Sequence, residues 1–163
     1  MFSSALFRFF LAMSGALGFL FSASIAFAEE DVPECFDALV RAKIVRQTPS
    51  VFPDCGADCI IMVWPWFLEL DVKRVITGEA AKGRQLTLAM QHTSFRKDLG
   101  TRRWWLRRNS LGGFNVLRIG DSEKLAQCGN GTPPMASYIS PGPDKTLADL
   151  LREGEEAYKS FSR

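Results

Sequence analysis

The residues best suited to chemistry lie in one segment, 96–108, where cations and tryptophans gather around a single acid. The cations are Arg96, Lys97, Arg102, Arg103, Arg107 and Arg108, and the acid is Asp98. If residues 101–109 form a strand, alternation places Arg103, Trp105 and Arg107 on one face. An exposed indole between two guanidinium groups is suited to an anionic or sugar-bearing ligand. The segment therefore predicts a ligand-binding face made of Arg103, Trp105 and Arg107.

The same segment has a second interpretation. Charged side chains on an edge strand keep sheets from pairing with other chains, and arginine stems cover apolar surface. On that hypothesis Arg103 and Arg107 only protect an edge. On either hypothesis Trp104 and Leu106 lie on the opposite face of the strand and belong to the core.

Other chemistry-bearing residues do not form a catalytic set. His92 is the one histidine of the chain, so a nucleophile–base pair would need Ser94 or Ser110, and no carboxylate is spaced to orient it. Glu69 and Asp71 share a strand face, as a glycosidase pair would, but a solvated face is expected there. We expect no enzyme activity, and a hydrolase around His92 is an alternative.

The cysteines are Cys35, Cys55, Cys59 and Cys128. An even number in an exported protein favours disulfides, and four cysteines allow three connectivities. We favour Cys55 with Cys59 across a short loop, and Cys35 with Cys128 tying the two ends of the domain. A metal site would need a second pair of ligands nearby, which the lone His92 does not supply. We therefore expect no metal and no cofactor.

The N-terminus has the features of an export signal. Arg8 precedes an apolar core over residues 9–21, and Ala26 and Ala28 place small residues just before an acidic run. The pattern predicts a signal peptide over residues 1–28, cleaved after Ala28. The alternative, an uncleaved anchor, is disfavoured because serines and glycines dilute the apolar run.

Export sets the expected compartment and partner. Cleavage would leave a single domain, residues 29–163, that is periplasmic or secreted and has no membrane span. Nucleic acid would suit a basic and aromatic barrel face, but export and a net charge of only +2 argue against it. We expect a protein, an anionic glycan or a lipid headgroup as the partner.

Strand-like alternation dominates the rest of the chain. The runs cover residues 38–46, 59–76, 86–91, 101–109 and 114–119. Pro49 and Pro53 should end the first run, Pro65 should mark a bulge or an edge in the second, and the step Lys73-Arg74-Val75 predicts another bulge. The aromatic run 64–67 is expected to be core. Together the runs predict a compact barrel over about residues 35–128.

The C-terminal part changes character. Residues 129–143 are rich in glycine and proline and predict an irregular surface segment. A three- and four-residue period over 146–161 then predicts an amphipathic helix, with Thr146 as its cap and Asp149 completing a capping box. We expect this helix to pack on the barrel. The alternative is a structural or assembly protein of the envelope whose helix binds a partner.

Three stretches of the strand pattern point to a known family. They are the segment Cys35 to Val45, the run Phe67 to Gly78 and the run Gln85 to Met90. Together they resemble the netrin-like module of tissue inhibitors of metalloproteinases. The resemblance implies an OB-type barrel with a packed helix, stabilised by disulfides, that binds proteins rather than transforming small molecules.

One departure limits what the resemblance implies. In the inhibitors the first cysteine is the mature N-terminus, and its amine chelates the zinc of the target enzyme. Here residues 29–34 would precede Cys35, so inhibition by that mechanism is not expected. The sequence as a whole predicts a mainly β fold, an OB-like closed barrel of five strands with one C-terminal amphipathic helix. The expected function is that of an exported, non-enzymatic binding module.

Overall fold

The computed structural model describes residues 34–52, 61–95, 99–121 and 124–161, which belong to one compact unit of the chain. The expected signal peptide, 1–28, and the expected Cys55–Cys59 disulfide lie outside these residues, as do Arg96, Lys97 and Asp98 of the basic segment. Among the described residues, no helix is both long enough and apolar enough to cross a bilayer.

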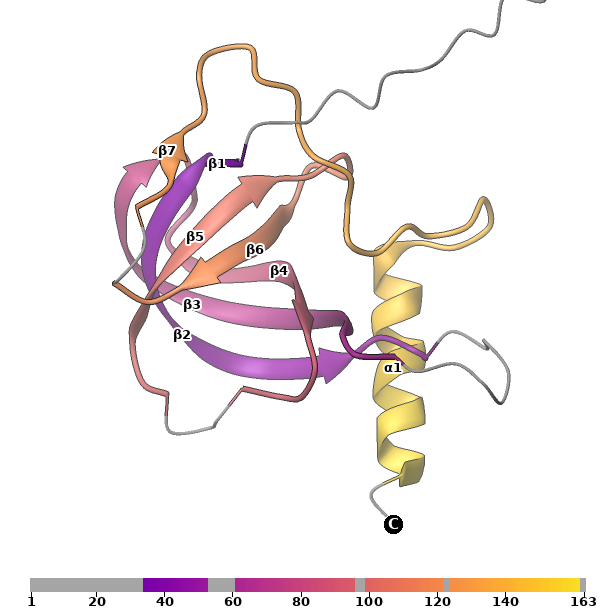
Figure 1. Ribbon diagram of the computed structural model, residues 1–163. Coiled ribbons are helices and arrows are strands. Elements are labelled where there is room, and N and C mark those ends of the chain that lie inside the picture. The colour runs from indigo at the N-terminus through magenta and orange to yellow at the C-terminus, as the bar shows by residue number, and fades with distance from the viewer. Residues whose placement is uncertain (1–33, 53–60, 96–98, 122–123, 162–163) are drawn as a thin grey trace, which may run out of the picture. The chain divides into compact units, whose positions relative to one another are not determined.

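Five strands with alternating side chains form one closed barrel (Figure 1). Its strands are β2 (Ala38–Pro49), β3 (Trp64–Gly78), β4 (Gly83–Gln91), β5 (Arg102–Arg108) and β6 (Phe114–Ile119). They pair in the order β2-β3-β4-β6-β5, and β5 pairs back onto β2 to close the barrel. The β4–β6 pair is parallel and the other pairs are antiparallel. The mainly β, OB-like barrel expected from the sequence is confirmed.

One face of each strand fills the barrel. The buried residues of this core are Ala38, Val40, Ala42, Trp66, Leu68, Leu70, Val72, Ala89, Trp104, Leu106 and Val116. They follow the alternation predicted for β2, β3 and β5, and Trp104 and Leu106 are fully buried, as expected. Because successive side chains point to opposite faces, the residues between them must face outward.

Bulges let the long strands β2 and β3 bend around the barrel. Between Arg41 and Ala42 the partner in β3 changes from Arg74 to Val72, so Lys73 is an extra residue in the ladder. This is the bulge predicted at Lys73-Arg74-Val75. The first strand extends three residues beyond the predicted range 38–46, and it ends at Pro49, one of the two prolines expected to end it.

Helix α1 (Leu147–Phe161) stands beside the ends of β2 and β3 (Figure 1), and its first turns pack with residues of the segment 129–143 against the outer side of the barrel. The residues packed together there are Phe67, Leu88, Ile139, Tyr138, Leu147, Leu150 and Leu151. The helix begins with the predicted capping box. The Asp149 amide donates to Thr146 Oγ1 at 3.2 Å, and the Thr146 amide donates to Asp149 Oδ2 at 3.0 Å. The predicted packing of the helix on the barrel is confirmed.

Two short strands cover a second part of the outer face. β1 (Cys35–Phe36) pairs in parallel with β7 (Ala126–Gln127), and the predicted disulfide between Cys35 and Cys128 joins them. Phe36 packs with Leu39 and Trp105 on the outside of the barrel. The covalent bond thus holds a cover over β5, the strand that carries the predicted ligand-binding face.

Candidate functional site

Trp105 lies under the cover formed by β1. Its side chain is 7% exposed, and its ring meets that of Phe36 edge-on, with the centroids 4.8 Å apart. Its Nε1 donates to the carbonyl of Gly120 at 3.3 Å. The prediction of an exposed indole platform is therefore wrong, because a distant two-residue strand packs over the ring.

Arg107 is likewise used inside the fold. Its side chain is 2% exposed, and Nη1 donates to Asp37 Oδ2 at 2.6 Å. Its Nη2 donates to the carbonyl of Pro133 in the glycine- and proline-rich segment. The expectation that Arg107 faces a ligand is corrected by this burial, since its charge is already matched by a protein carboxylate.

Arg103 stays exposed, and the strand register places it in a row of guanidinium groups. Arg41 of β2 pairs with Arg103 of β5 on one side and with Arg74 of β3 on the other. Neighbouring strands lie about 4.8 Å apart, so the three positions span roughly 10 Å. Sequence reasoning missed Arg41 and Arg74, because the row depends on strand order and on the bulge at Lys73.

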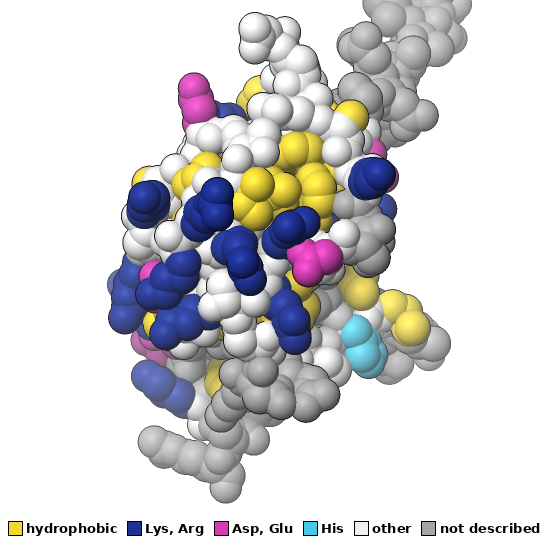
Figure 2. All heavy atoms as spheres, turned by 90° about the vertical axis from the view of Figure 1, so that its left-hand side faces the viewer, with side chains coloured by type: hydrophobic (Ala, Val, Ile, Leu, Met, Phe, Trp, Pro, Cys, Tyr) yellow, Lys and Arg dark blue, Asp and Glu magenta, His cyan; other side chains and the backbone are white. Residues whose placement is uncertain are grey.

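Further cations surround this row. We define the basic face by six exposed residues, Arg41, Lys43, Lys73, Arg74, Arg102 and Arg103. Figure 2 shows Lys and Arg side chains gathered on the side of the barrel that lies at the left of Figure 1, beside a hydrophobic area. The basic face thus lies on the bend of β2 and β3 and at the start of β5.

Acidic residues neutralise part of the basic face. Arg103 Nε lies 2.9 Å from Asp121 Oδ1, and Lys73 Nζ lies 2.6 Å from Asp71 Oδ2. The hydrogen bond from Lys73 is the largest cause that lowers the pKa of Asp71. Within the described part of the chain, no acid forms an ion pair with Arg41 or Arg74. An excess of positive charge therefore remains at the centre of the row.

The strand that carries Arg103 is an inner strand of the barrel. β5 pairs with β2 over Arg102–Leu106 and with β6 over Trp104–Arg108. The interpretation of these arginines as protectors of a sheet edge is therefore wrong. Edge protection therefore does not explain the positive charge of the exposed residues Arg102 and Arg103.

The residues considered for catalysis are engaged in separate local contacts. Exposed His92 donates from Nδ1 to the carbonyl of Met62 at 2.6 Å, and among the described residues no serine or carboxylate bonds to it. Glu69 accepts from Arg84 at 2.6 Å, and this bond is the largest cause that lowers its pKa. Both carboxyl groups of the suspected pair, Glu69 and Asp71, are therefore held ionised by cations, and neither has the raised pKa of a general acid.

No metal-binding cluster is found in the described ranges, where no three His, Cys, Asp or Glu side chains are grouped suitably. Comparison of the chain with family models, with curated proteins and with solved structures finds no match. The resemblance to the netrin-like module therefore stays a prediction based on strand spacing.

Proposed function

We propose that this protein is an exported, non-enzymatic binding module, periplasmic or secreted, that holds an anionic partner on the basic face. The partner would be a glycan, a lipid headgroup or an acidic protein surface. The observation that carries the proposal is the row Arg74, Arg41 and Arg103, which lies side by side across three neighbouring strands.

The row is electrostatically unfavourable in the isolated protein. Like charges directly opposite one another on neighbouring strands destabilise a sheet, and Arg41 has an arginine on both sides. A bound anion would relieve that repulsion. Guanidinium groups also bind carboxylate, sulfate and phosphate with two parallel hydrogen bonds, which lysine does not do. The arrangement over three strands suits an extended polyanion better than a single small ion.

The covalent chemistry supports placement outside the cytoplasm. The Cys35–Cys128 bond joins a residue that precedes the barrel strands in the sequence to one that follows them, and such bonds persist in oxidising compartments. The signal-like pattern of residues 1–28 supports the same compartment. The resemblance to netrin-like modules favours binding over catalysis.

Binding to defined polyanions tests the proposal. The purified protein is titrated with heparin, with polygalacturonate, and with phosphatidylcholine vesicles that contain or lack phosphatidylglycerol. The variant Arg41→Gln/Arg74→Gln removes two charges from the centre of the row. At about 1 kcal/mol for each basic residue near an anionic surface, its affinity should fall roughly thirtyfold. The probe that binds most tightly identifies the class of partner.

The control removes the same charge elsewhere. Lys145→Gln/Arg152→Gln alters two exposed cations at the helix, which Figure 1 shows on the other side of the barrel. This variant should bind like the natural protein. An equal loss of affinity in both variants would contradict the proposal. The proposal would also be contradicted if the natural protein bound none of these polyanions, and no acidic protein, at low salt. Substitution of Trp105 is not a suitable test, because its ring is packed.

A further inference from the structure

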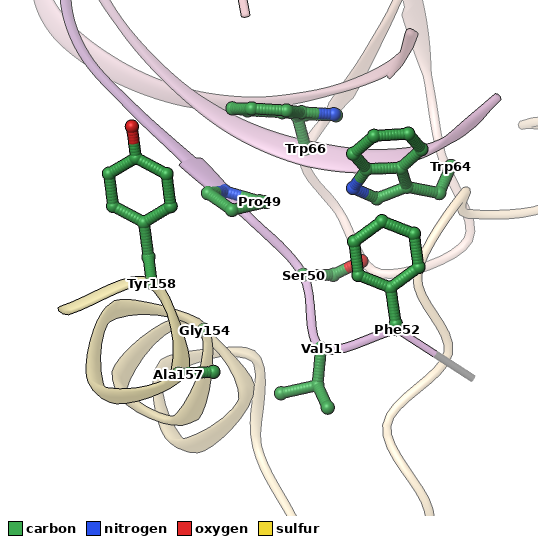
Figure 3. A pocket seen from close by; sticks show the side chains of 9 residues that line it. All are labelled: Pro49, Ser50, Val51, Phe52, Trp64, Trp66, Gly154, Ala157 and Tyr158. Carbon is green, nitrogen blue, oxygen red and sulfur yellow. The ribbon is translucent and has the colours of Figure 1, made fainter. Parts of the chain in front are cut away.

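An apolar hollow of about 640 Å³ lies where the ends of β2 and β3 meet helix α1 (Figure 3). Its walls include Pro49, Phe52, Trp64, Trp66, Ala157 and Tyr158. Ligand pockets in proteins usually measure roughly 300–1,000 Å³ and are mostly apolar with a few polar groups. The hollow is therefore of the right size and character for a small organic molecule, and it is separate from the basic face.

Gly154 determines where the helix touches the barrel beside this hollow. A β-carbon on Gly154 would lie 2.3 Å from the carbonyl oxygen of Pro49, so only glycine permits this approach. The next turn of the helix presents Ala157 and Tyr158 to the hollow (Figure 3). The small side chain of Ala157 leaves space that a larger residue would fill.

Aromatic rings form the opposite wall. The rings of Phe52 and Trp64 lie 4.3 Å apart, and those of Trp64 and Trp66 lie 5.7 Å apart. Trp66 is 5% exposed and belongs to the core, as the sequence predicted, whereas Trp64 is only partly buried. The rings are tilted against one another, and with Phe52 exposed and Trp64 partly buried they provide a surface for a planar or acyl group.

Both tryptophans of the wall carry a buried indole N–H that no described protein group accepts. The other two tryptophans differ, since Trp104 donates to the carbonyl of Ala42 and Trp105 to that of Gly120. Buried donors normally find an acceptor, and an unmade hydrogen bond is unfavourable. In Figure 3 the nitrogens of Trp64 and Trp66 lie on the edges of the rings that face each other. Each of these N–H groups therefore still needs an acceptor.

We propose that the hollow binds a small amphiphile. Its aromatic or acyl body packs against Phe52, Trp64 and Ala157, and its carboxylate, carbonyl or sulfonate oxygen accepts from the indole N–H groups of Trp64 and Trp66. Because both indole nitrogens are buried, the partly exposed ring of Trp64 turns when the oxygen enters. Binding therefore changes tryptophan fluorescence.

The probe is 8-anilinonaphthalene-1-sulfonate, which combines aromatic rings with sulfonate oxygens. Titration of the folded protein should give saturable binding, a shift in tryptophan emission and energy transfer from tryptophan to the probe. Decanoate should displace the probe, whereas decyltrimethylammonium, which has a chain of equal length and no acceptor oxygen, should not. Absence of saturable binding, or equal displacement by both amphiphiles, overturns the proposal.

Two variants of the same type locate the site. Ala157→Phe fills the hollow and should weaken probe binding more than tenfold, while Ala148→Phe places the same ring on an exposed position of the same helix and should leave binding unchanged. Trp66→Phe keeps a ring but removes a donor worth about 1 kcal/mol, so affinity should fall roughly fivefold. Thermal unfolding shows whether each variant is folded. Equal affinity of the two phenylalanine variants for the probe overturns the proposal. It is also overturned if the natural protein forms a dimer that Ala157→Phe disrupts and Ala148→Phe does not.

Discussion

Arg107 Nη1 and Asp37 Oδ2 lie 2.6 Å apart, with 2% of the arginine side chain and 18% of the aspartate side chain exposed. The same carboxyl oxygen accepts from the backbone amide of Arg108 at 2.6 Å. Asp37 lies between β1 and β2, and Arg107 lies on β5 and also contacts Pro133. The ion pair therefore joins the cover strand, the barrel and the irregular segment.

Removing one partner of this ion pair should strongly destabilise the fold. Arg107→Ala leaves the Asp37 carboxylate without its cation, and breaking a buried pair in this way costs about 3–5 kcal/mol. Arg103→Ala serves as the control, because its pair with Asp121 is exposed and exposed pairs contribute about 1 kcal/mol or less. Urea unfolding followed by circular dichroism measures both free energies. Similar stabilities of the two variants would contradict the structural role assigned to Arg107.

Loss of the Cys35–Cys128 disulfide should also lower stability. The bond closes a loop with a sequence separation of 93 residues, and the chain-entropy model gives about 4.6 kcal/mol for a loop of this length. Cys35→Ser/Cys128→Ser should therefore unfold at a clearly lower urea concentration. The predicted Cys55–Cys59 bond would close a much shorter loop, so Cys55→Ser/Cys59→Ser should cost about 2 kcal/mol at most. The reverse order of the two effects would refute this ranking.

Alanine variants at two glycines distinguish the effect of backbone strain on stability from the effect of steric overlap. Gly78 and Gly83 both have positive φ, 80° and 88°, so alanine is strained at either position by roughly 1–2 kcal/mol. A β-carbon at Gly78 would also lie 1.8 Å from the carbonyl oxygen of Asp37, whereas one at Gly83 meets no atom within 4 Å. Gly78→Ala should thus lower the melting temperature well beyond Gly83→Ala. Equal melting temperatures would show that β3 can move away from Asp37 freely.

The helix cap should make stability depend on acid pH. Hydrogen bonds from Thr146 hold the pKa of Asp149 below its usual value of 3.8. Because the pKa of Asp149 is lower in the folded than in the unfolded state, its ionised carboxyl stabilises the fold at pH values above the unfolded-state pKa. This stabilisation is lost as the pH falls through the folded-state pKa. The melting temperature of Asp149→Asn should therefore fall less than that of the natural protein below about pH 4.

A neighbouring carboxyl provides the control for this experiment. Asp144→Asn removes an exposed acid that accepts no hydrogen bond from any described residue, so the pH profile of the melting temperature should keep its shape. If Asp149→Asn and the natural protein had parallel profiles, the cap would not be the source of the acid sensitivity.

Local patterns predicted the parts of the fold that depend on neighbouring residues in the chain. Alternation identified the core faces of β2, β3 and β5, and the break near Lys73 identified a bulge that the β2–β3 pairing contains. The spacing of Thr146 and Asp149 identified the start of α1. These features were predictable because side-chain period and capping act within a few residues.

Features that depend on distant segments were not predicted. Alternation placed Trp105 on an outer face correctly, but nothing in its neighbourhood indicated that Phe36 would cover it. The row of Arg41, Arg74 and Arg103 forms only because β2 lies between β3 and β5 and because the bulge brings Arg74 into register. Burial and cross-strand pairing are set by the closed barrel, which a single stretch of sequence does not specify.

The long separation between Cys35 and Cys128 has a consequence for biosynthesis. Ribosomes make the chain from its N-terminus, so Cys35, Cys55 and Cys59 all exist before Cys128 is translated. Until then the thiol of Cys35 has only incorrect partners available. Oxidation that outpaces translation would trap a mispaired chain, and a thiol–disulfide isomerase should therefore increase the yield of the correctly bonded protein.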